Sequence, residues 1–219
     1  MLSIEKDSDI RIREVSFFLK AIKRLENESG YSPIEIKAMK GLFFVHLYGV
    51  LEFTIVNSVT FLLQKIREDK YNIHQFKPTM LSIVLDSECK SLASSGVKKK
   101  WERRWTLFEK IFSSEEATIN DTVIPADGMN FKYPQLESIK KALCIGDPII
   151  PEKRLIGKLE ELAENRNAIA HGRESPVAIG SRYTVRDLGK RLNDIDLLRS
   201  HIITVFKSHY SKKSFLKGS

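Results

Sequence analysis

The stretch GLFFVHLYGVLEFTIVNSVTFLL, Gly41–Leu63, is the most apolar part of the chain and decides its class of fold. It is long enough to cross a bilayer, which takes about 20 apolar residues. His46, Glu52 and Asn57 interrupt it, and a carboxylate near the middle of a bilayer is costly. We therefore predict a long helix through a protein core, over about residues 33–67, and no membrane partner.

Apolar residues recur along this predicted helix every three or four positions, which is the spacing of one helix face. Phenylalanines and leucines on other sides make the helix apolar almost all round, as a central helix requires. The stripe consists of Leu42, Val45, Tyr48, Leu51, Ile55, Val59, Leu62 and Ile66.

The rest of the chain has similar spacing, so we predict an all-α protein with a single domain, residues 1–219. Further helices are predicted over about 12–25, 79–94, 97–112, 133–146, 151–171 and 184–205. Two capping boxes, Ser32 with Glu35 and Thr184 with Asp187, mark helix starts, because each side chain can accept the other residue's backbone N–H.

The chain is basic, with a formal net charge of +8 over 219 residues. Such a surplus favours a polyanionic partner, so RNA, DNA and an acidic protein are all candidates. The two cysteines, Cys89 and Cys144, are too few for a disulfide framework, and we predict that both are buried thiols. Reduced thiols, and a charged first stretch with no apolar signal segment, indicate a cytoplasmic protein.

Polar residues gather in ENRNAIAHGR, Glu164–Arg173, at the end of a predicted helix. At about 100° per residue, Asn167 and His171 lie about 40° apart on one face, whereas Arg166 lies about 140° from His171. One rigid helix therefore does not bring the arginine and the histidine to one point. They can meet if the last turn tightens or unwinds at Gly172, or if two copies of the helix pack across a two-fold axis.

An arginine and a histidine in one cleft suit the cleavage of RNA without a metal ion. Arg166 can bind phosphate oxygens with two N–H groups and stabilise the charge of the transition state. His171 can move protons near neutral pH, from the ribose 2′-hydroxyl or to the leaving oxygen. Attack by that hydroxyl leaves a cyclic phosphate and excludes DNA. Asn167 can hold the imidazole or a phosphate oxygen through its amide.

The alternative is the ordinary polar end of a helix, where His171 interacts with the helix dipole. Spacing alone does not decide between a ribonuclease site and an ordinary helix end. Arg67 and His74 form a second arginine–histidine pair in this chain, separated by six residues. The surroundings of the two pairs differ. Arg67 stands before a loop-like composition, whereas Arg166 is followed by an asparagine and His171 by a helix-ending glycine.

ENRNAIAHG resembles the R-x4-6-H motif of the HEPN superfamily, whose all-helical members carry an arginine, a polar residue and then a histidine. Two more segments, in the same order along the chain, are similar to its toxin and defence branch. VHLYGVLEFTI, Val45–Ile55, has that branch's aromatic-x3-Glu pattern at Tyr48 and Glu52. NFKYPQLESIKKALCIG, Asn130–Gly146, resembles the segment before the motif helix.

The resemblance implies a HEPN-like bundle of four core helices with inserted helices, homodimeric, with the active cleft between subunits. It implies that Arg166, Asn167 and His171 form the catalytic motif and that Glu52 supports them. Apart from the family, Glu52 is equally a buried acid paired with a lysine or a tyrosine. Residues of about 68–128 match no known pattern, and we treat them as an insertion in the domain.

The expected function is a metal-independent endoribonuclease that needs no cofactor, as a toxin or phage-defence effector. Its expected partners are RNA, a second copy of the chain, and an antitoxin or another regulatory protein. The alternative is a non-catalytic HEPN-like module that binds RNA, a nucleotide or a protein. The other histidines show no zinc-binding spacing, so no metal site is expected.

The segment VKKKWERRWTLFEKIF, Val97–Phe112, places aromatic and basic residues on different helix faces. We predict that the aromatic face, Trp101, Trp105, Phe108 and Phe112, lies in the core. The basic face either follows a phosphate backbone or is simply solvated. The RNA-binding candidates are Lys99, Lys100, Arg103 and Arg104, together with Arg173 beside the motif.

Overall fold

The apolar run lies inside one long helix, α2 (Pro33–Glu68), in a computed structural model that describes residues 1–28, 30–126 and 130–218. In these residues every regular element is a helix, and β-structure is limited to isolated bridges, which confirms the all-α prediction. The other helices are α1 (Leu2–Asn27), α3 (Leu81–Val84), α4 (Asp86–Ala93), α5 (Lys100–Ile111), α6 (Tyr133–Ala142), α7 (Arg154–Ala170), α8 (Pro176–Gly180) and α9 (Val185–Lys212), with short 3-10 helices at Ile73–Gln75 and Val97–Lys99.

The chain forms two compact units whose segments alternate along the sequence, and each is described by itself. The first unit comprises Met1–Asn57, Gly128–Pro134 and Ile150–Thr204; the second comprises Ser58–Asp127, Gln135–Ile149 and Val205–Ser219. Both α2 and α9 contribute residues to each unit. The single domain with an insertion at about 68–128 stays a prediction, and the last two residues of that insertion lie outside the described residues.

The helix α2 meets the length and composition of a membrane span, yet 56% of its apolar window is buried inside the protein. Phe43, Leu47, Tyr48 and Leu51 are all fully buried. These side chains are removed from water by other parts of the chain, as a core helix requires. The prediction that this helix lies in a protein core is confirmed for these four residues. Leu42, which belongs to the predicted stripe, is exposed.

Both predicted helix starts are capped, the one at Thr184 by the complete reciprocal pair and the one at Ser32 with Ile34 in place of Glu35 as the donor to the serine. The backbone N–H of Ser32 donates to Glu35 Oε2 at 2.7 Å, and Ser32 Oγ accepts from the N–H of Ile34. The backbone N–H of Thr184 donates to Asp187 Oδ2 at 3.1 Å, and that of Asp187 donates to Thr184 Oγ1 at 3.2 Å. These bonds satisfy N–H groups that a helix start leaves without a partner.

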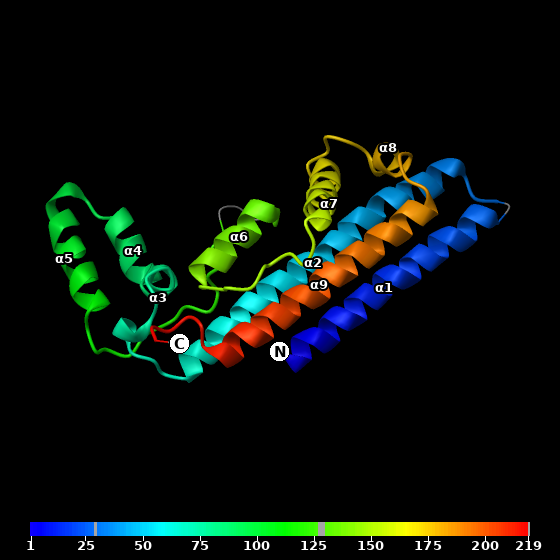
Figure 1. Cartoon of the computed structure of the whole chain (residues 1–219). Coiled ribbons are helices and arrows are strands. Elements are labelled where there is room, and N and C mark those ends of the chain that lie inside the picture. Colours follow the sequence, from blue (N-terminus) through cyan, green and yellow to red (C-terminus); the bar gives the residue numbers. More distant parts are fainter. Residues whose placement is uncertain (29, 127–129, 219) are drawn as a thin grey trace. The chain divides into compact units, whose positions relative to one another are not determined.

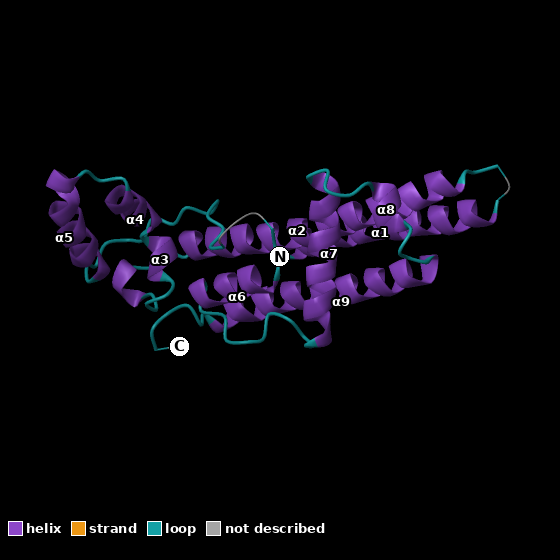
Figure 2. Ribbon diagram, turned by 90° about the horizontal axis from the view of Figure 1, so that it is seen from above, coloured by secondary structure: helices purple, strands orange, loops and turns teal. Residues whose placement is uncertain are grey.

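In the first unit, α1 runs alongside α2 and α9 (Figures 1 and 2), and a buried polar cluster joins the three. Arg199 of α9 is only 5% exposed, and its Nη1 donates to Ser8 Oγ of α1 at 3.0 Å. Ser8 Oγ in turn lies 2.8 Å from Thr54 Oγ1 of α2. Asp9 and Asp196 pair with the remaining guanidinium nitrogens. A buried charge requires such partners, so this cluster sets the register of the three helices.

The short helix α8 packs its backbone directly on the backbone of α2. A Cβ atom added to Gly41 would lie 2.0 Å from the carbonyl oxygen of Pro176, and one added to Gly180 would lie 1.8 Å from that of Lys37. Both glycines are therefore required by the close approach of two helices, since only a residue without a side chain fits there.

The Gly41→Ala variant is expected to lower the free energy of unfolding by about 3 kcal/mol, because the added methyl group forces α8 away from α2. Gly49 is the matched control: it lies in the same helix, and a Cβ there meets nothing within 4 Å. Gly49→Ala is expected to raise stability by up to about 1 kcal/mol through helix propensity. Denaturant unfolding of both variants measures this, and equal effects would contradict the close packing.

Two predictions about the second unit are wrong. Cys89 is an exposed free thiol and Cys144 a half-buried one, so neither is a buried core residue. The aromatic residues of the segment 97–112 do share one helix face, but that face is exposed. The spacing of residues shows which side chains share a face and does not show whether another element covers it.

His209 of α9 is the buried histidine of the second unit. Its ring packs against Phe215, and its Nε2 has no hydrogen-bond partner among the described residues. Burial, with a smaller effect of Lys77, lowers the pKa of His209 to about 4, although a hydrogen bond with the backbone of Leu143 opposes the shift. We infer that the imidazole is neutral in the folded chain.

The free energy of unfolding is expected to fall by about 3 kcal/mol as the pH drops from about 6.5 to about 4 on account of His209. The unfolded chain binds a proton near the ordinary pKa, whereas the folded chain does so only near the lowered pKa. A His209→Gln variant is expected to lose this part of the pH dependence. Unfolding at pH 7 and pH 4 checks it, and identical losses in wild type and variant would contradict the assignment.

Candidate functional site

The predicted motif occupies the last turns of α7 and the residues just after it. His171 ends the helix, and Gly172 follows with a φ angle of +66°, in the left-handed region that favours glycine. The backbone N–H of Glu174 then bonds to the carbonyl of Ala168 at 3.1 Å and closes the turn. The helix therefore ends at the glycine, as the sequence predicts.

Several neighbouring side chains hold the guanidinium of Arg166 in place. Its Nη1 donates to Asn167 Oδ1 at 3.0 Å and to Asn130 Oδ1 at 3.2 Å. Its Nη2 lies 3.7 Å from Glu52 Oε2, and the guanidinium carbon lies 4.8 Å from the ring centroid of Tyr48. Tyr48 and Glu52 stand one turn apart on α2, so they present one face to the arginine. Residues from three separate segments of the first unit thus meet at one cation.

The guanidinium keeps donors for a ligand. An arginine has five N–H groups, and the two on Nη1 of Arg166 are used by the two amide oxygens. Within the residues that the structure describes, its Nε–H makes no hydrogen bond, and Nη2 has only the longer ion pair with Glu52. The side chain is 25% exposed. The edge formed by Nε and Nη2 therefore has the geometry that binds two oxygens of a phosphate.

Tyr48 connects α2 to the segment before α6. Its hydroxyl accepts the backbone N–H of Phe131 at 2.7 Å inside the protein. Burial raises the pKa of Tyr48, while the hydrogen bond from Phe131 opposes that shift. The phenol therefore stays protonated at neutral pH. By holding Phe131, it also holds the neighbouring Asn130 against Arg166.

The structure brings three of the four predicted site residues together and leaves the fourth apart. Asn167 is only 6% exposed, and its amide oxygen is bonded to Arg166 rather than to His171. Glu52 is the acid at the same arginine. The imidazole of His171 is exposed and forms no hydrogen bond or ion pair with any described residue. Within one chain, His171 therefore takes no part in the polar cluster that holds Arg166.

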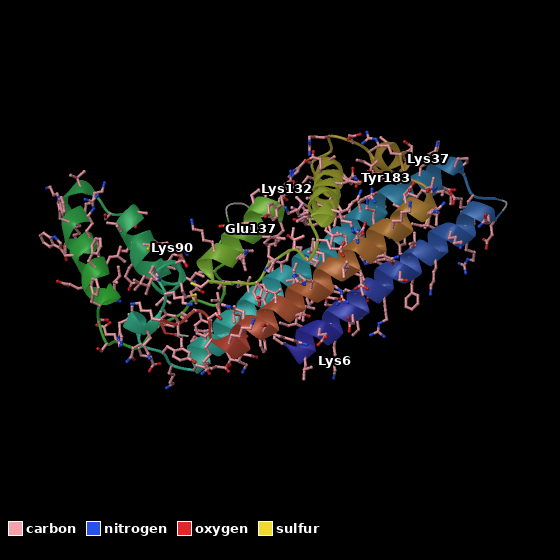
Figure 3. All side chains as sticks on the ribbon, viewed as in Figure 1. Lys6, Lys37, Lys90, Lys132, Glu137 and Tyr183 are labelled. Atoms are coloured by element: carbon pink, nitrogen blue, oxygen red, sulfur yellow. The ribbon has the colours of Figure 1, made fainter. Side chains whose placement is uncertain are left out.

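Acidic side chains accompany the basic residues around the motif. Arg173 Nη2 lies 2.8 Å from Glu164 Oε1, and Lys132 Nζ, labelled in Figure 3, lies 3.5 Å from Glu164 Oε2 and 3.9 Å from Glu160 Oε2. The hydrogen bond from Arg173 lowers the pKa of Glu164. Exposed ion pairs of this kind contribute little to stability, so Arg173 can exchange its carboxylate for a phosphate. Its role in RNA binding stays a prediction.

The sequence did not indicate a second polar cluster, on another side of α7. Asn165 Nδ2 donates to the hydroxyl of Tyr183 at 2.9 Å, and that hydroxyl donates to Glu161 Oε1 at 2.8 Å. Arg191 of α9 donates to both oxygens of Glu161 at 2.9 and 3.0 Å. This cluster fixes the rotation of α7 and with it the direction of Arg166. The available signal was Asn165, the first asparagine of the motif, which directly precedes the arginine.

The other four RNA-binding candidates belong to the second unit. Lys99, Lys100 and Arg103 are exposed, and the guanidinium carbon of Arg104 lies 4.9 Å from the ring centroid of Trp101. Because these residues lie in a unit that is described separately from the site, their contact with RNA stays a prediction. Among the described residues, no group of three or more His, Cys, Asp or Glu side chains could hold a metal ion.

The model of a protein family described as RiboL-PSP-HEPN matches residues 6–210. The match includes α2, the segment at Asn130 and α7, which together build the site around Arg166. The chain belongs to the RiboL-PSP-HEPN family. The predicted resemblance to the HEPN superfamily is confirmed, and a HEPN domain indicates a nuclease or RNA-related role in general. No curated protein and no solved structure matches the chain.

Proposed function

We propose that this RiboL-PSP-HEPN protein is a metal-independent endoribonuclease that works as a homodimer. The observation that supports it most is the immobilised guanidinium of Arg166, which Asn130, Asn167 and Glu52 hold while one edge keeps its donors. A cation held in advance needs little reorganisation when charge develops on a phosphate. A residue that only ended a helix would not need three polar partners from separate segments.

The proposed reaction breaks one P–O bond and forms another. One His171 imidazole removes the proton of the ribose 2′-hydroxyl, and O2′ attacks the adjacent phosphorus. Arg166 stabilises the extra negative charge on the equatorial oxygens. The P–O5′ bond breaks, and a second, protonated His171 donates its proton to the leaving oxygen. The products are a 2′,3′-cyclic phosphate and a 5′-hydroxyl.

The homodimer supplies the second imidazole and brings histidine and arginine together. Within one chain, His171 is exposed, and the ideal helix spacing sets it about 140° from Arg166 around the axis. A two-fold axis beside the end of α7 places the same patch of both copies in one cleft. Two histidines then serve as base and acid, and two arginines face one phosphodiester. Asn167 and Glu52 act in this proposal as positioning residues for Arg166.

The experiment is digestion of an RNA oligonucleotide by the purified chain in EDTA. We expect fragments that end in a 2′,3′-cyclic phosphate and begin with a 5′-hydroxyl. The matched substrate carries a 2′-deoxyribose on the 5′ side of each cleaved bond, and we expect it to stay intact, because the nucleophile is missing. Cleavage of that deoxy substrate, or cleavage only after Mg²⁺ is added, would contradict the proposal.

A toxin or phage-defence effector in the cytoplasm, restrained by an antitoxin or another regulatory protein, is the setting we propose for this nuclease. An RNase that needs no metal and no cofactor is active wherever RNA is present, so its host must restrain it. Expression of the wild-type chain is then expected to stop growth, while a His171→Ala chain is tolerated. Equal growth with both would remove this part of the proposal.

A second candidate is a HEPN module that binds RNA or a nucleotide without cleaving it. The acids around the motif favour this alternative, because Glu52 faces Arg166 and Glu164 pairs with Arg173. Each carboxylate competes with a phosphate for its cation. A gel shift of intact RNA by the wild-type chain, with no cleavage after long incubation, would select it.

A further inference from the structure

The helix α5 exposes a row of large aromatic side chains. Soluble helices normally turn such residues to a core, and contiguous exposed apolar patches mark interaction sites. The exposed fractions are 62% for Trp101, 61% for Trp105, 60% for Phe108 and 79% for Phe112.

The opposite, polar side of α5 is the one that packs within the second unit, against α4. Lys110 forms an ion pair with Glu88 of α4. Arg103 and Thr106 line the groove between the two helices with Ser87. Figure 1 shows the two helices as neighbours. The helix therefore turns its polar face inward and its aromatic face outward, which is the reverse of a helix folded only onto its own chain.

The spacing of the aromatic residues identifies the kind of surface that covers them. Positions 101, 105, 108 and 112 are separated by four, three and four residues, which is the a/d pattern of a coiled coil. At about 100° per residue they fall within about 60° of each other. The half-buried Leu107 and Ile111 widen the apolar side on one flank, and the part that stays exposed is the row of aromatic residues. The spacing of that row fits the seam between two helices.

The charges beside the seam identify which helix. With Trp105 and Phe112 at a, Arg104 stands at g, and Glu102 and Glu109 stand at e. In a parallel pair of α5 helices, each Arg104 meets Glu109 of the other copy. In an antiparallel pair, the two e positions would set glutamate against glutamate. Phosphates of RNA or of a lipid surface would also meet these two glutamates.

We propose that α5 pairs in parallel with α5 of a second copy of this chain. Aromatic side chains bury about 150–250 Å² each when covered. At the exposures above, four of them offer on the order of 500 Å² per copy, or roughly 1,000 Å² in the pair, which is near the lower limit of a specific interface. The pairing does not depend on RNA cleavage, and it adds a self-association surface outside the motif that carries the proposed nuclease.

The first experiment is cross-linking in a background with Cys89→Ser and Cys144→Ser. In a parallel pair, position 105 of one copy faces position 105 of the other, so Trp105→Cys is expected to form an intermolecular disulfide under mild oxidation. Lys99→Cys, an exposed position just before α5 and outside the aromatic row, is the matched control and is expected to stay uncross-linked. No disulfide at position 105, or equal yields at both positions, would overturn the pairing.

The second experiment reverses the charges beside the seam. Arg104→Glu alone and Glu109→Arg alone are each expected to lower the cross-linking yield of the Trp105→Cys chain several-fold. The double variant restores opposite charges and is expected to recover it. Equal loss in the single and double variants would overturn the parallel register. A shift in tryptophan fluorescence on adding RNA or anionic vesicles would show that one of these occupies the seam, and it would also overturn the pairing. The cleavage assay of the wild-type chain is scored separately, so failure of one proposal does not imply failure of the other.

Discussion

The His171→Ala variant is expected to cleave RNA about 1,000-fold more slowly than the wild-type chain, with an unchanged free energy of unfolding. The rate falls because the substitution removes both the base and the acid of the proposed reaction. Stability is retained because the imidazole is exposed and has no hydrogen bond or ion pair among the described residues. Initial rates on one RNA oligonucleotide and denaturant unfolding of both proteins measure the two effects.

His46 is the matched control for this substitution. It is an exposed histidine of the first unit, on α2, and its ring packs only against Phe18 among the aromatic residues described. Its position along α2 is about 160° from that of Tyr48 around the helix, away from the arginine site. His46→Ala is expected to leave the cleavage rate unchanged. If both alanine variants lost the same activity, the loss would come from the fold and His171 would have no chemical role.

The Arg166→Lys variant is expected to lower kcat about 100-fold to 1,000-fold while changing RNA affinity only a few-fold. A lysine keeps the positive charge, which supports non-specific attraction to RNA. Its ammonium group has three donors and no planar fork, so it cannot hold two amide oxygens and also bind two oxygens of the phosphate. Single-turnover rates at saturating protein separate the chemical step from binding.

Arg173→Lys is the matched control for Arg166→Lys. Arg173 stands seven residues further along the same motif and pairs with one exposed glutamate, Glu164. Its charge is all that the ion pair requires, so the substitution is expected to change kcat less than about threefold. A large loss of kcat in Arg173→Lys with little loss in Arg166→Lys would show that Arg173 binds the phosphate, and it would contradict the role proposed for Arg166.

The helices that build the site could be predicted from the sequence because they depend on short-range patterns. The apolar spacing of residues 33–67 predicts α2, and the two capping boxes predict the starts of α2 and α9 within a residue. Gly172 marks the end of α7 because a positive φ angle favours glycine. The motif in these elements also indicated Arg166, Asn167, His171 and Glu52 before any contact was known.

The contacts of those residues could not be predicted in the same way. Asn130 and Phe131 lie far along the chain from the residues that they bond, Arg166 and Tyr48. The helical wheel placed Asn167 beside His171, yet the amide bonds to Arg166, because a side chain selects among neighbours that the fold supplies. The same limit applies to α5, whose aromatic face is correctly grouped and wrongly assigned to the core.

The sequence by itself determined which segments are helices, where two of them begin, where α7 ends, and which residues are able to carry the chemistry. Those properties depend on residues a few positions apart, within reach of one helix turn. The tertiary structure alone decided that Glu52 and Asn130 converge on Arg166, that His171 faces solvent, and that Gly41 allows α8 to touch α2. Those properties depend on which distant surfaces pack together, and packing is a property of the whole folded chain.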